Sequence, residues 1–410
     1  MVAGCTSQAH HAAVSRPQPG APGPTTSDVS EIVGPALSTK PAVREGLASS
    51  GVSELSAPGR TSEINLIGST TEHGYVFDQY RNLAYPCAVS GYQTFTIATR
   101  VGSSATETRP LWVYMHGGGA GYFDDSGAPR PDNSFMTEES AAMQRDLLTG
   151  AALTRLVAGD PAVFRMMAVS MCDRDLYGGA DVADPNNPNT TPDGRTRTVN
   201  GLFSTKAAIQ FALASYPTDD YFLYGTSAGA AGTFHIAWAL EAQGIPPTGL
   251  VADSGVLSTP WQAATAGRCG RSAEDERRIT SRLHPDVTAV GNDPDELVSS
   301  GRLTVPIVQV WVVNDPGQCG DTPIACPLRD GSTRMMGSVD CLHEPLRLAL
   351  AARDRLSMSM RLCVDDPAAA GACDMHTPTQ IVGAINTSTE AAVAFDPVIV
   401  DWVDQRLRDD

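Results

Sequence analysis

The stretch that decides the fold is Tyr221-Phe222-Leu223-Tyr224-Gly225-Thr226-Ser227-Ala228-Gly229. An apolar run typical of a buried strand leads directly into the pattern G-x-S-x-G, and small residues typical of a helix follow. A chain that turns sharply from strand to helix has no room for side chains beside the serine, which takes a strained backbone conformation and exposes its hydroxyl. The stretch therefore predicts a nucleophile elbow with Ser227 at its tip.

A second glycine-rich turn lies upstream of the elbow. His116-Gly117-Gly118-Gly119 follows the apolar run 111–115, which is also typical of a strand. A glycine-rich turn after a strand, ahead of an elbow, suits the binding of an oxyanion that develops during acyl transfer. Together, in this order, the two motifs predict a serine hydrolase.

From residue 61 onward the chain alternates strand-like and helix-like segments, which indicates a mostly parallel central sheet flanked by helices, the α/β-hydrolase class. The predicted strands are 95–98, 111–115, 164–171, 221–224, 249–252, 305–313 and 362–364. The predicted helices are 201–215, 228–243 and a long helical tail that follows His376 and ends at 402–408. Segments 181–198 and 265–300 have the composition of insertions, which often shape a substrate entrance.

Residues 1–60 are rich in Ala, Ser, Thr, Pro and Gly and lack periodicity, so they predict a disordered tether ahead of a catalytic domain at 61–410. Val2-Ala3-Gly4-Cys5 resembles the lipobox of bacterial lipoproteins, in which the cysteine carries the lipid. This pattern predicts lipidation of Cys5 and a possible membrane anchor, although the charged and hydrophobic parts of a signal peptide are absent.

The composition narrows the partners and the compartment. The net charge is −17, and Lys40 and Lys206 are the only lysines, which argues against nucleic acid and disfavours a polyanionic substrate. Setting Cys5 aside, the nine cysteines leave an even set that can pair, as in an exported protein of an oxidising compartment; buried free thiols of a cytosolic enzyme are the alternative. No cysteine or histidine spacing typical of zinc is present, and no cofactor is expected.

The order of residues in α/β-hydrolases, serine then acid then histidine, selects the rest of the triad. Asp315 follows the strongest late strand, where a loop carboxylate would reach the catalytic edge of the sheet, and Asp253 is the alternative acid. His343 and His376 are the histidines left after the acid. We favour His376 because it lies beyond the predicted last strand.

Several short motifs, in one consistent order between residues 75 and 380, resemble the pectin acetylesterase/Notum group of α/β-hydrolases. They are Cys87-Ala88-Val89-Ser90-Gly91-Tyr92, Met171-Cys172-Asp173 with Gly178-Gly179, the Ser227 elbow, Asp253-Ser254-Gly255, Asp315-Pro316-Gly317-Gln318, and Cys363 through Cys373-Asp374-Met375-His376. The resemblance implies Ser227 as nucleophile, Asp315 as acid and His376 as base. It also implies oxyanion-hole amides from Gly118, Gly119 and Ala228, and a Cys87–Cys172 disulfide. A second disulfide, Cys363–Cys373, is expected from the resemblance and because the two cysteines are close in sequence.

The chain departs from that family at His116 to Tyr122, where the family has an acidic residue, two glycines, an aromatic residue and a nearby cysteine. This stretch instead resembles esterases and lipases with an HGGG motif, so the acyl specificity is open. We expect an exported carboxylester hydrolase, either secreted or a bacterial surface or periplasmic lipoprotein, that removes short acyl groups such as the acetyl groups of a polysaccharide. The alternatives are a lipase-like or polyester-depolymerising esterase, an acyltransferase, and a non-catalytic binding module of the same fold.

Overall fold

The computed structural model describes residues 55–408 of the 410-residue chain, with internal gaps. The gaps are 88–91, 105, 131–139, 158, 160–163, 172, 190–193, 269–271, 321, 329–330, 354–355, 364–374, 381–384 and 387–392. The predicted tether lies outside the described residues except for its last part, which packs on the domain. Leu55 is buried in the core, and the buried ammonium of Lys206 donates hydrogen bonds to the carbonyls of Leu55 and Ala57.

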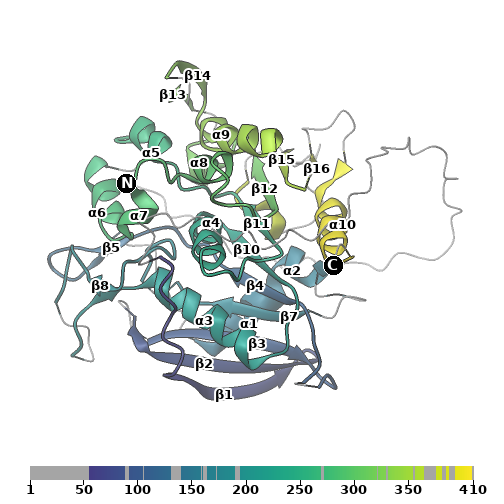
Figure 1. Cartoon of the computed structure of the whole chain (residues 1–410). Helices are drawn as coiled ribbons and strands as arrows, with labels where there is room; N and C mark the ends of the chain where they lie inside the picture. The colour runs from purple at the N-terminus through teal and green to yellow at the C-terminus, as the bar shows by residue number, and fades with distance from the viewer. Residues whose placement is uncertain are drawn as a thin grey trace, which may run out of the picture. The chain divides into compact units, whose positions relative to one another are not determined.

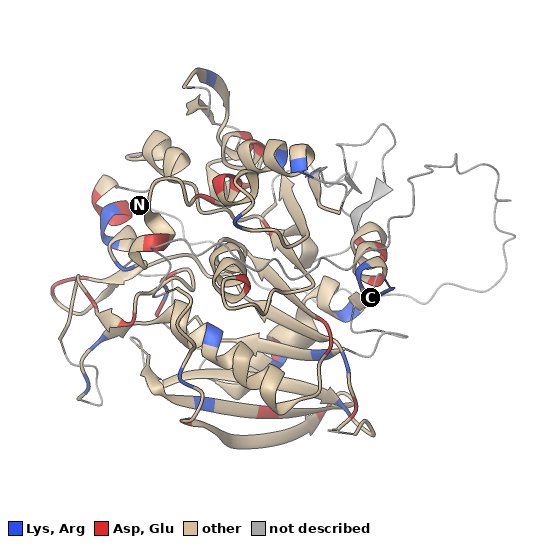
Figure 2. Ribbon diagram, viewed as in Figure 1, with Lys and Arg blue, Asp and Glu red and all other residues tan. Residues whose placement is uncertain are grey.

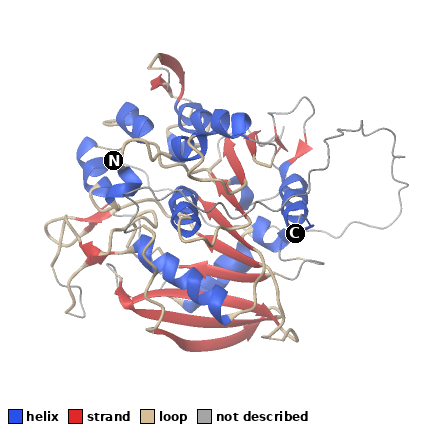
Figure 3. Ribbon diagram, in the orientation of Figure 1, coloured by secondary structure: helices blue, strands red, loops and turns tan. Residues whose placement is uncertain are grey.

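A single eleven-stranded sheet forms the centre of the described chain (Figure 3). Its strands, in spatial order, are β1 (Ile64–Glu72), β2 (Tyr75–Pro86), β3 (Tyr92–Arg100), β7 (Arg165–Val169), β4 (Leu111–Met115), β10 (Tyr221–Thr226), β11 (Gly249–Asp253), β12 (Ile307–Val312), β15 (Met358–Cys363), β16 (Ile385–Asn386) and β17 (Val393–Ala394). From β7 to β15 neighbouring strands run parallel, whereas β1 to β3 and β16 to β17 pair antiparallel with their neighbours.

Helices cover both faces of the sheet (Figure 1). Because side chains alternate along a strand, Leu223 of β10 packs with α3 (Gly201–Ser215) and α4 (Ala228–Glu241), whereas Phe222 and Tyr224 pack with α1 (Ala141–Gly150), α2 (Ala152–Val157) and α10 (Phe395–Arg408). Both faces of the parallel strands are therefore buried, which explains why their sequences are continuous apolar runs.

The parallel strands end at one edge of the sheet, and this edge positions the site. Ser227 follows β10, Asp253 ends β11, and Asp315 lies three residues beyond the end of β12. With its elbow between β10 and α4, the chain has the α/β-hydrolase fold that the sequence predicts.

The structure corrects some predicted elements. The tail after His376 is not one long helix, because the 3₁₀ turn η2 (Pro378–Gln380) and strands β16 and β17 precede α10. The β1–β2 hairpin and helix α9 (Ser338–Arg353) were not predicted. Pro345 lies inside α9, and because proline is disfavoured in the interior of a helix, the sequence argues against a helix there.

The two predicted insertions contain short elements of their own. Strands β8 (Val182–Ala183) and β9 (Thr198–Val199) bracket the first, and α6 (Ala273–Thr280), α7 (Pro285–Thr288) and α8 (Pro294–Ser299) lie within the second. Two further short hairpins pair β5 (Tyr122–Phe123) with β6 (Pro129–Arg130) and β13 (Pro323–Pro327) with β14 (Thr333–Gly337).

Charged residues of both signs are interspersed over the described chain, and Figure 2 shows no segment dominated by Lys and Arg there. A search of the described helices for one long and apolar enough to cross a membrane found none.

Candidate active site

Ser227 lies at the tip of a sharp turn between β10 and α4. Its φ of 53° and ψ of −118° place it in a region that residues with side chains rarely adopt, so the strained backbone that the motif predicts is present. The turn passes so close to the end of β4 that a Cβ atom at position 229 would lie 1.9 Å from the carbonyl oxygen of Met115. Glycine is therefore required at position 229.

Asp315 and His376 meet beside this turn. The Nδ1 atom of His376 lies 2.7 Å and 2.9 Å from the two carboxylate oxygens of Asp315. The Asp315 side chain is fully buried, whereas the His376 side chain is 32% exposed. Because a carboxylate accepts hydrogen bonds, this contact assigns the Nδ1 proton to His376 and leaves its Nε2 as the basic nitrogen.

The surroundings of His376 favour its protonated form. Burial alone would lower the pKa of His376, but the hydrogen bond and the negative charge of Asp315, with a further contribution from Asp253, raise it above its usual value. A histidine whose pKa is moderately raised can accept a proton in one step of a reaction and donate it in the next.

The alternative acid, Asp253, has other partners. Its carboxylate accepts hydrogen bonds from the backbone N–H of Thr379 at 2.8 Å, from the Thr379 hydroxyl, and from the hydroxyl of Ser254 at 2.8 Å. Burial raises the pKa of Asp253 to about 6, against the lowering effect of these hydrogen bonds. Asp253 thus holds the segment that follows His376, and no hydrogen bond joins the Asp253 carboxylate to the His376 ring in the part of the chain that the structure describes.

The alternative base, His343, is fully buried in α9. Its ring stacks on Trp311 with a centroid separation of 5.0 Å, accepts a hydrogen bond from Gln309 at Nδ1, and donates one from Nε2 to the side-chain oxygen of Gln318, each over 2.9 Å. Burial lowers the pKa of His343 to about 3, with a smaller contribution from His376. His343 therefore lies in the core behind Gln318, and Gln318 is the residue that lines the cavity.

Of the three predicted oxyanion-hole residues, Gly119 and Ala228 line the same cavity as Ser227, and Gly118 lies beside Gly119 in an exposed turn. Ala228 is the first residue of α4, so its N–H has no acceptor within the helix and is free for a ligand.

Two buried arginines hold the turn at residues 117–121, called the oxyanion turn after its predicted role. The guanidinium of Arg174 donates to the carbonyl of Ala120 over 3.1 Å, and the N–H of Gly121 donates to the carbonyl of Arg174 over 3.0 Å. Arg282 donates to the carbonyl of Gly121. A Cβ atom at position 121 would lie 2.4 Å from the Arg174 guanidinium, so only glycine allows this close approach.

Arg282 in turn is paired with Asp184, with 3.2 Å between the Nε atom and the carboxylate and with both side chains fully buried. One partner comes from each of the two insertions, so the insertions meet in an ion pair behind the oxyanion turn. Arg174, Arg282 and Asp184 were not predicted as site residues from the sequence. No spacing pattern connects them, and only their burial in the folded chain reveals their role.

The cavity at Ser227 and His376 has a volume of about 90 Å³. Its wall is mostly apolar and consists chiefly of Leu176, Val256, Leu257, Trp261, Ile279 and Leu342. Gln262 of α5 (Thr259–Thr265) and Glu276 of α6 also line it, and both of them border a larger groove between these helices as well. A small chamber thus adjoins a wider groove between α5 and α6.

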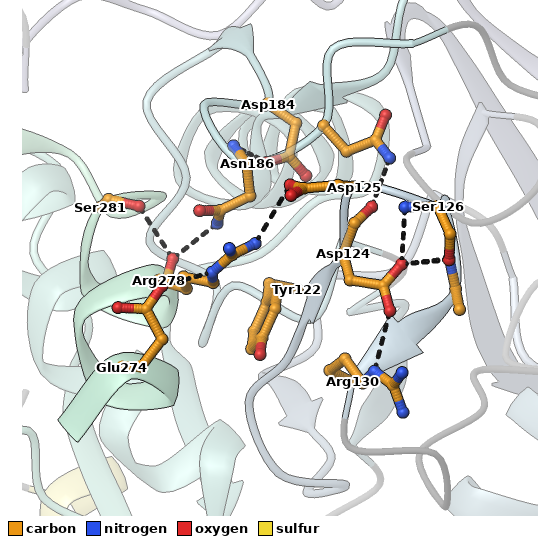
Figure 4. Close-up of polar contacts among 12 residues, drawn as sticks. Tyr122, Asp124, Asp125, Ser126, Arg130, Asp184, Asn186, Glu274, Arg278 and Ser281 are labelled. Atoms are coloured by element: carbon orange, nitrogen blue, oxygen red, sulfur yellow. Dashed lines mark hydrogen bonds and ion pairs between the residues drawn. The ribbon is translucent and has the colours of Figure 1, made fainter. Parts of the chain in front are cut away.

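A network of charged side chains ties α6 to the loop that follows the oxyanion turn (Figure 4). Arg278 contacts Glu274 at 2.7 Å and Asp125 at 3.5 Å, and its guanidinium lies over the ring of Tyr122. The hydroxyl of Tyr122 donates to Asp275 over 2.6 Å. These contacts fix the position of the helix that carries Glu276 and Ile279 into the cavity wall.

All four cysteines whose side chains the structure describes are disulfide-bonded. Cys326 and Cys341 are bridged, which joins β13 to α9, and Cys87 and Cys319 are each disulfide-bonded as well. The predicted partners Cys172 and Cys373, the side chain of Cys363 and the predicted lipidation site Cys5 lie outside the described residues, so both predicted pairings and the lipidation stay predictions. Among the described residues no group of three or more His, Cys, Asp or Glu side chains could hold a metal ion.

Comparison with solved structures finds esterases among the similar proteins, all at low identity. Carboxyl esterase 2 from the mycorrhizal fungus Tuber melanosporum is 16% identical over 77% of this chain and 81% of its own, with a TM-score of 0.40. Brefeldin A esterase, a bacterial homologue of human hormone-sensitive lipase, is 14% identical over 72% and 67%, with a TM-score of 0.39. A thermostable esterase from Pseudomonas putida ECU1011 is 11% identical over 86% and 84%, with a TM-score of 0.39. No protein-family model matches the chain, and no curated protein matches it significantly.

Proposed function

We propose that this protein is a serine carboxylester hydrolase that acts through an acyl-enzyme, with Ser227 as nucleophile, His376 as general base and Asp315 as the acid that orients it. The observation that carries the proposal is that Ser227, at a strained elbow, and His376, bonded to a buried Asp315, line one small cavity together with Gly119 and Ala228. Nucleophile, base and oxyanion donors are the parts that acyl transfer requires.

In the first half of the proposed reaction, Nε2 of His376 takes the proton of the Ser227 hydroxyl while the serine oxygen bonds to the ester carbonyl carbon. The carbonyl electrons move onto its oxygen, and the N–H groups of Gly119 and Ala228 stabilise this oxyanion. When the carbonyl re-forms, the alcohol oxygen leaves and takes the proton from His376. Asp315 keeps the ring in the correct tautomer and stabilises its positive charge throughout.

In the second half, a water molecule takes the place of the alcohol. His376 accepts a proton from this water as its oxygen bonds to the acyl carbon, and the second oxyanion collapses with release of the Ser227 oxygen, which regains the proton. The products are a carboxylic acid and an alcohol, and the enzyme returns to its starting state.

The size of the cavity supports a short acyl group. A cavity of about 90 Å³ is smaller than the roughly 150 Å³ cavity that holds a benzene molecule. An acetyl group therefore suits such a chamber better than an octanoyl chain does. The wider groove at Gln262 and Glu276 leaves room for a larger alcohol, and we propose an acetylated polysaccharide as the substrate, in keeping with the resemblance to pectin acetylesterases.

The disulfides favour an exported enzyme, because such bonds persist mainly in oxidising compartments. We therefore propose that the protein acts outside the cytoplasm.

The experiment that tests the proposed function is pre-steady-state hydrolysis of p-nitrophenyl acetate by the full chain and by Ser227→Ala. We expect a burst of nitrophenol from the wild type and a loss of turnover of several orders of magnitude in the variant, with an unchanged circular dichroism spectrum. Retention of most activity by Ser227→Ala would reject Ser227 as nucleophile. Release of acetate from acetylated xylan or pectin, compared with activity on octanoyl esters, then separates the deacetylase from the lipase-like alternative.

A further inference from the structure

Trp261 of α5 lies between two cavities. One is the chamber of about 90 Å³ at Ser227, and the other, of about 140 Å³, lies between α5, α8, β13 and α9; Trp261 lines both. Pairs of residues adjacent in sequence also face different cavities. Leu257 and Leu342 line the chamber at Ser227, whereas Ser258 and Cys341 line the second cavity. Trp261 is therefore part of the wall of both cavities.

The indole of Trp261 is fixed in place. It is 6% exposed, and its Nε1–H donates to both the carbonyl and the hydroxyl of Ser338, at 3.0 Å and 3.1 Å. Its ring packs with Ile324, Cys326, Cys341 and Leu342, where the Cys326–Cys341 disulfide joins β13 to α9. Rotation of the indole out of the wall would break two hydrogen bonds and open this packed cluster, so the wall is rigid.

We propose that Trp261 is the residue that limits the acyl length this site accepts, by closing the acyl chamber against the second cavity. The inference rests on the proposed function and adds its specificity determinant. An acyl chain that extends from the chamber toward the second cavity must either displace the indole or leave methylenes unseated, and each methylene changes transition-state binding by about 10-fold or more. Removal of the indole would join the two cavities and more than double the space available beyond Ser227.

The lining of the second cavity defines what the joined space would accept. Pro260, Pro327 and Leu328 give it apolar surface, and Asp293, Asp295 and Glu296 border it as well. Apolar walls with acidic neighbours suit an uncharged, unbranched acyl chain and repel one that ends in a carboxylate. The chemical class expected for the opened site is therefore a neutral straight-chain acyl ester.

The test compares kcat/KM for p-nitrophenyl esters from acetyl to octanoyl between the full-length wild type and Trp261→Ala, with Trp261→Leu as a second variant if the alanine variant does not fold. We expect the ratio of hexanoyl to acetyl hydrolysis to rise about 10-fold or more in the variant. Trp402→Ala is the matched control: Trp402 is 3% exposed and also uses its indole N–H, yet it lines neither cavity, so its ratio should equal that of the wild type.

A double variant identifies the space that the longer chain enters. Leu328 lines only the second of the two cavities, so Trp261→Ala combined with Leu328→Trp refills that cavity and should return the ratio toward the wild-type value. A ratio that is unchanged in folded Trp261→Ala and Trp261→Leu, or that rises equally in Trp402→Ala, would overturn the inference. A wild type without any ester hydrolysis would instead reject the proposed function, so the two failures are distinguishable.

Discussion

The two glycine turns at the candidate active site are held in different ways. At the elbow, residues 225–229, the backbone of the turn is packed directly against the backbone at the end of β4, with no side chain between them. At the oxyanion turn, residues 117–121, side chains from distant parts of the chain do the holding, namely Arg174 and Arg282. The elbow is therefore held by close backbone packing and the oxyanion turn by side chains.

The two turns differ in how many substitutions they allow. A backbone-to-backbone contact allows almost no substitution, because neither partner can move without shifting a central strand. A side-chain clamp can change when an insertion changes, since Arg282 and Asp184 come from separate insertions. We expect the nucleophile side of the site to be rigid and the oxyanion side to be adjustable.

The largest expected effect concerns the residues on the elbow side. Asp315→Asn should lower kcat by about four orders of magnitude, because an amide in this place stabilises the wrong tautomer of His376. Asp253→Asn is the matched control, since Asp253 is equally buried but bonded to Thr379 instead. Steady-state kinetics of both purified variants test this expectation. A large loss of kcat in Asp253→Asn but not in Asp315→Asn would identify Asp253, at the end of β11, as the acid.

The next effect tests the elbow itself. Gly229→Ala should lower activity about 100-fold or more through displacement of Ser227, and lower the free energy of unfolding by about 3 kcal/mol, because its Cβ would meet the Met115 carbonyl at 1.9 Å. Gly119→Ala provides the contrast, since nothing lies within 4 Å of a Cβ there and only its φ of 73° opposes a side chain. Urea unfolding measures the stability of both variants, and ester hydrolysis measures their activity. Equal losses in the two variants would contradict the difference between the turns.

The third effect tests the clamp. Arg282→Met should lower kcat about 10- to 100-fold with a smaller change in KM, because the Gly121 carbonyl loses its donor and the oxyanion turn shifts. It should also cost about 3 kcal/mol of stability, since the buried carboxylate of Asp184 loses its ion pair with Arg282.

The double variant Arg282→Met, Asp184→Asn separates positioning from stability. Removing the buried charge should restore much of the free energy of unfolding while kcat stays low. If kcat recovers together with stability, Arg282 has a purely structural role, and the clamp does not position the turn.

The same contrast explains how much could be predicted from the sequence. The parallel sheet and the elbow follow from apolar runs and from glycine spacing within nine residues. Order along the chain favoured Asp315 and His376 over Asp253 and His343, and the favoured pair is hydrogen-bonded in the structure. The clamp and the wall at Trp261 could not be found in this way, because each depends on contacts between segments far apart in the chain. A buried arginine also has the same letter as an exposed one. The β1–β2 hairpin is local, but β1 is mostly exposed and lacks the apolar run of a buried strand.

The smallest expected effect concerns pH, and it again separates the two turns. His376 must be neutral at Nε2 to accept a proton, so kcat/KM should fall as the pH drops through its pKa; since Asp315 and Asp253 raise that pKa, the midpoint should lie above the ordinary value of about 6.5. Asp253→Asn should move the midpoint downward, because one of the two negative charges is lost.

The oxyanion side should not contribute to this pH dependence. Burial lowers the pKa of His116 to about 4, against a hydrogen bond to the Gly117 carbonyl, so this ring stays neutral across the range, and His116→Asn should leave the midpoint in place. A midpoint that follows His116 rather than Asp253 would place the titrating group at the oxyanion turn and reverse the division of roles.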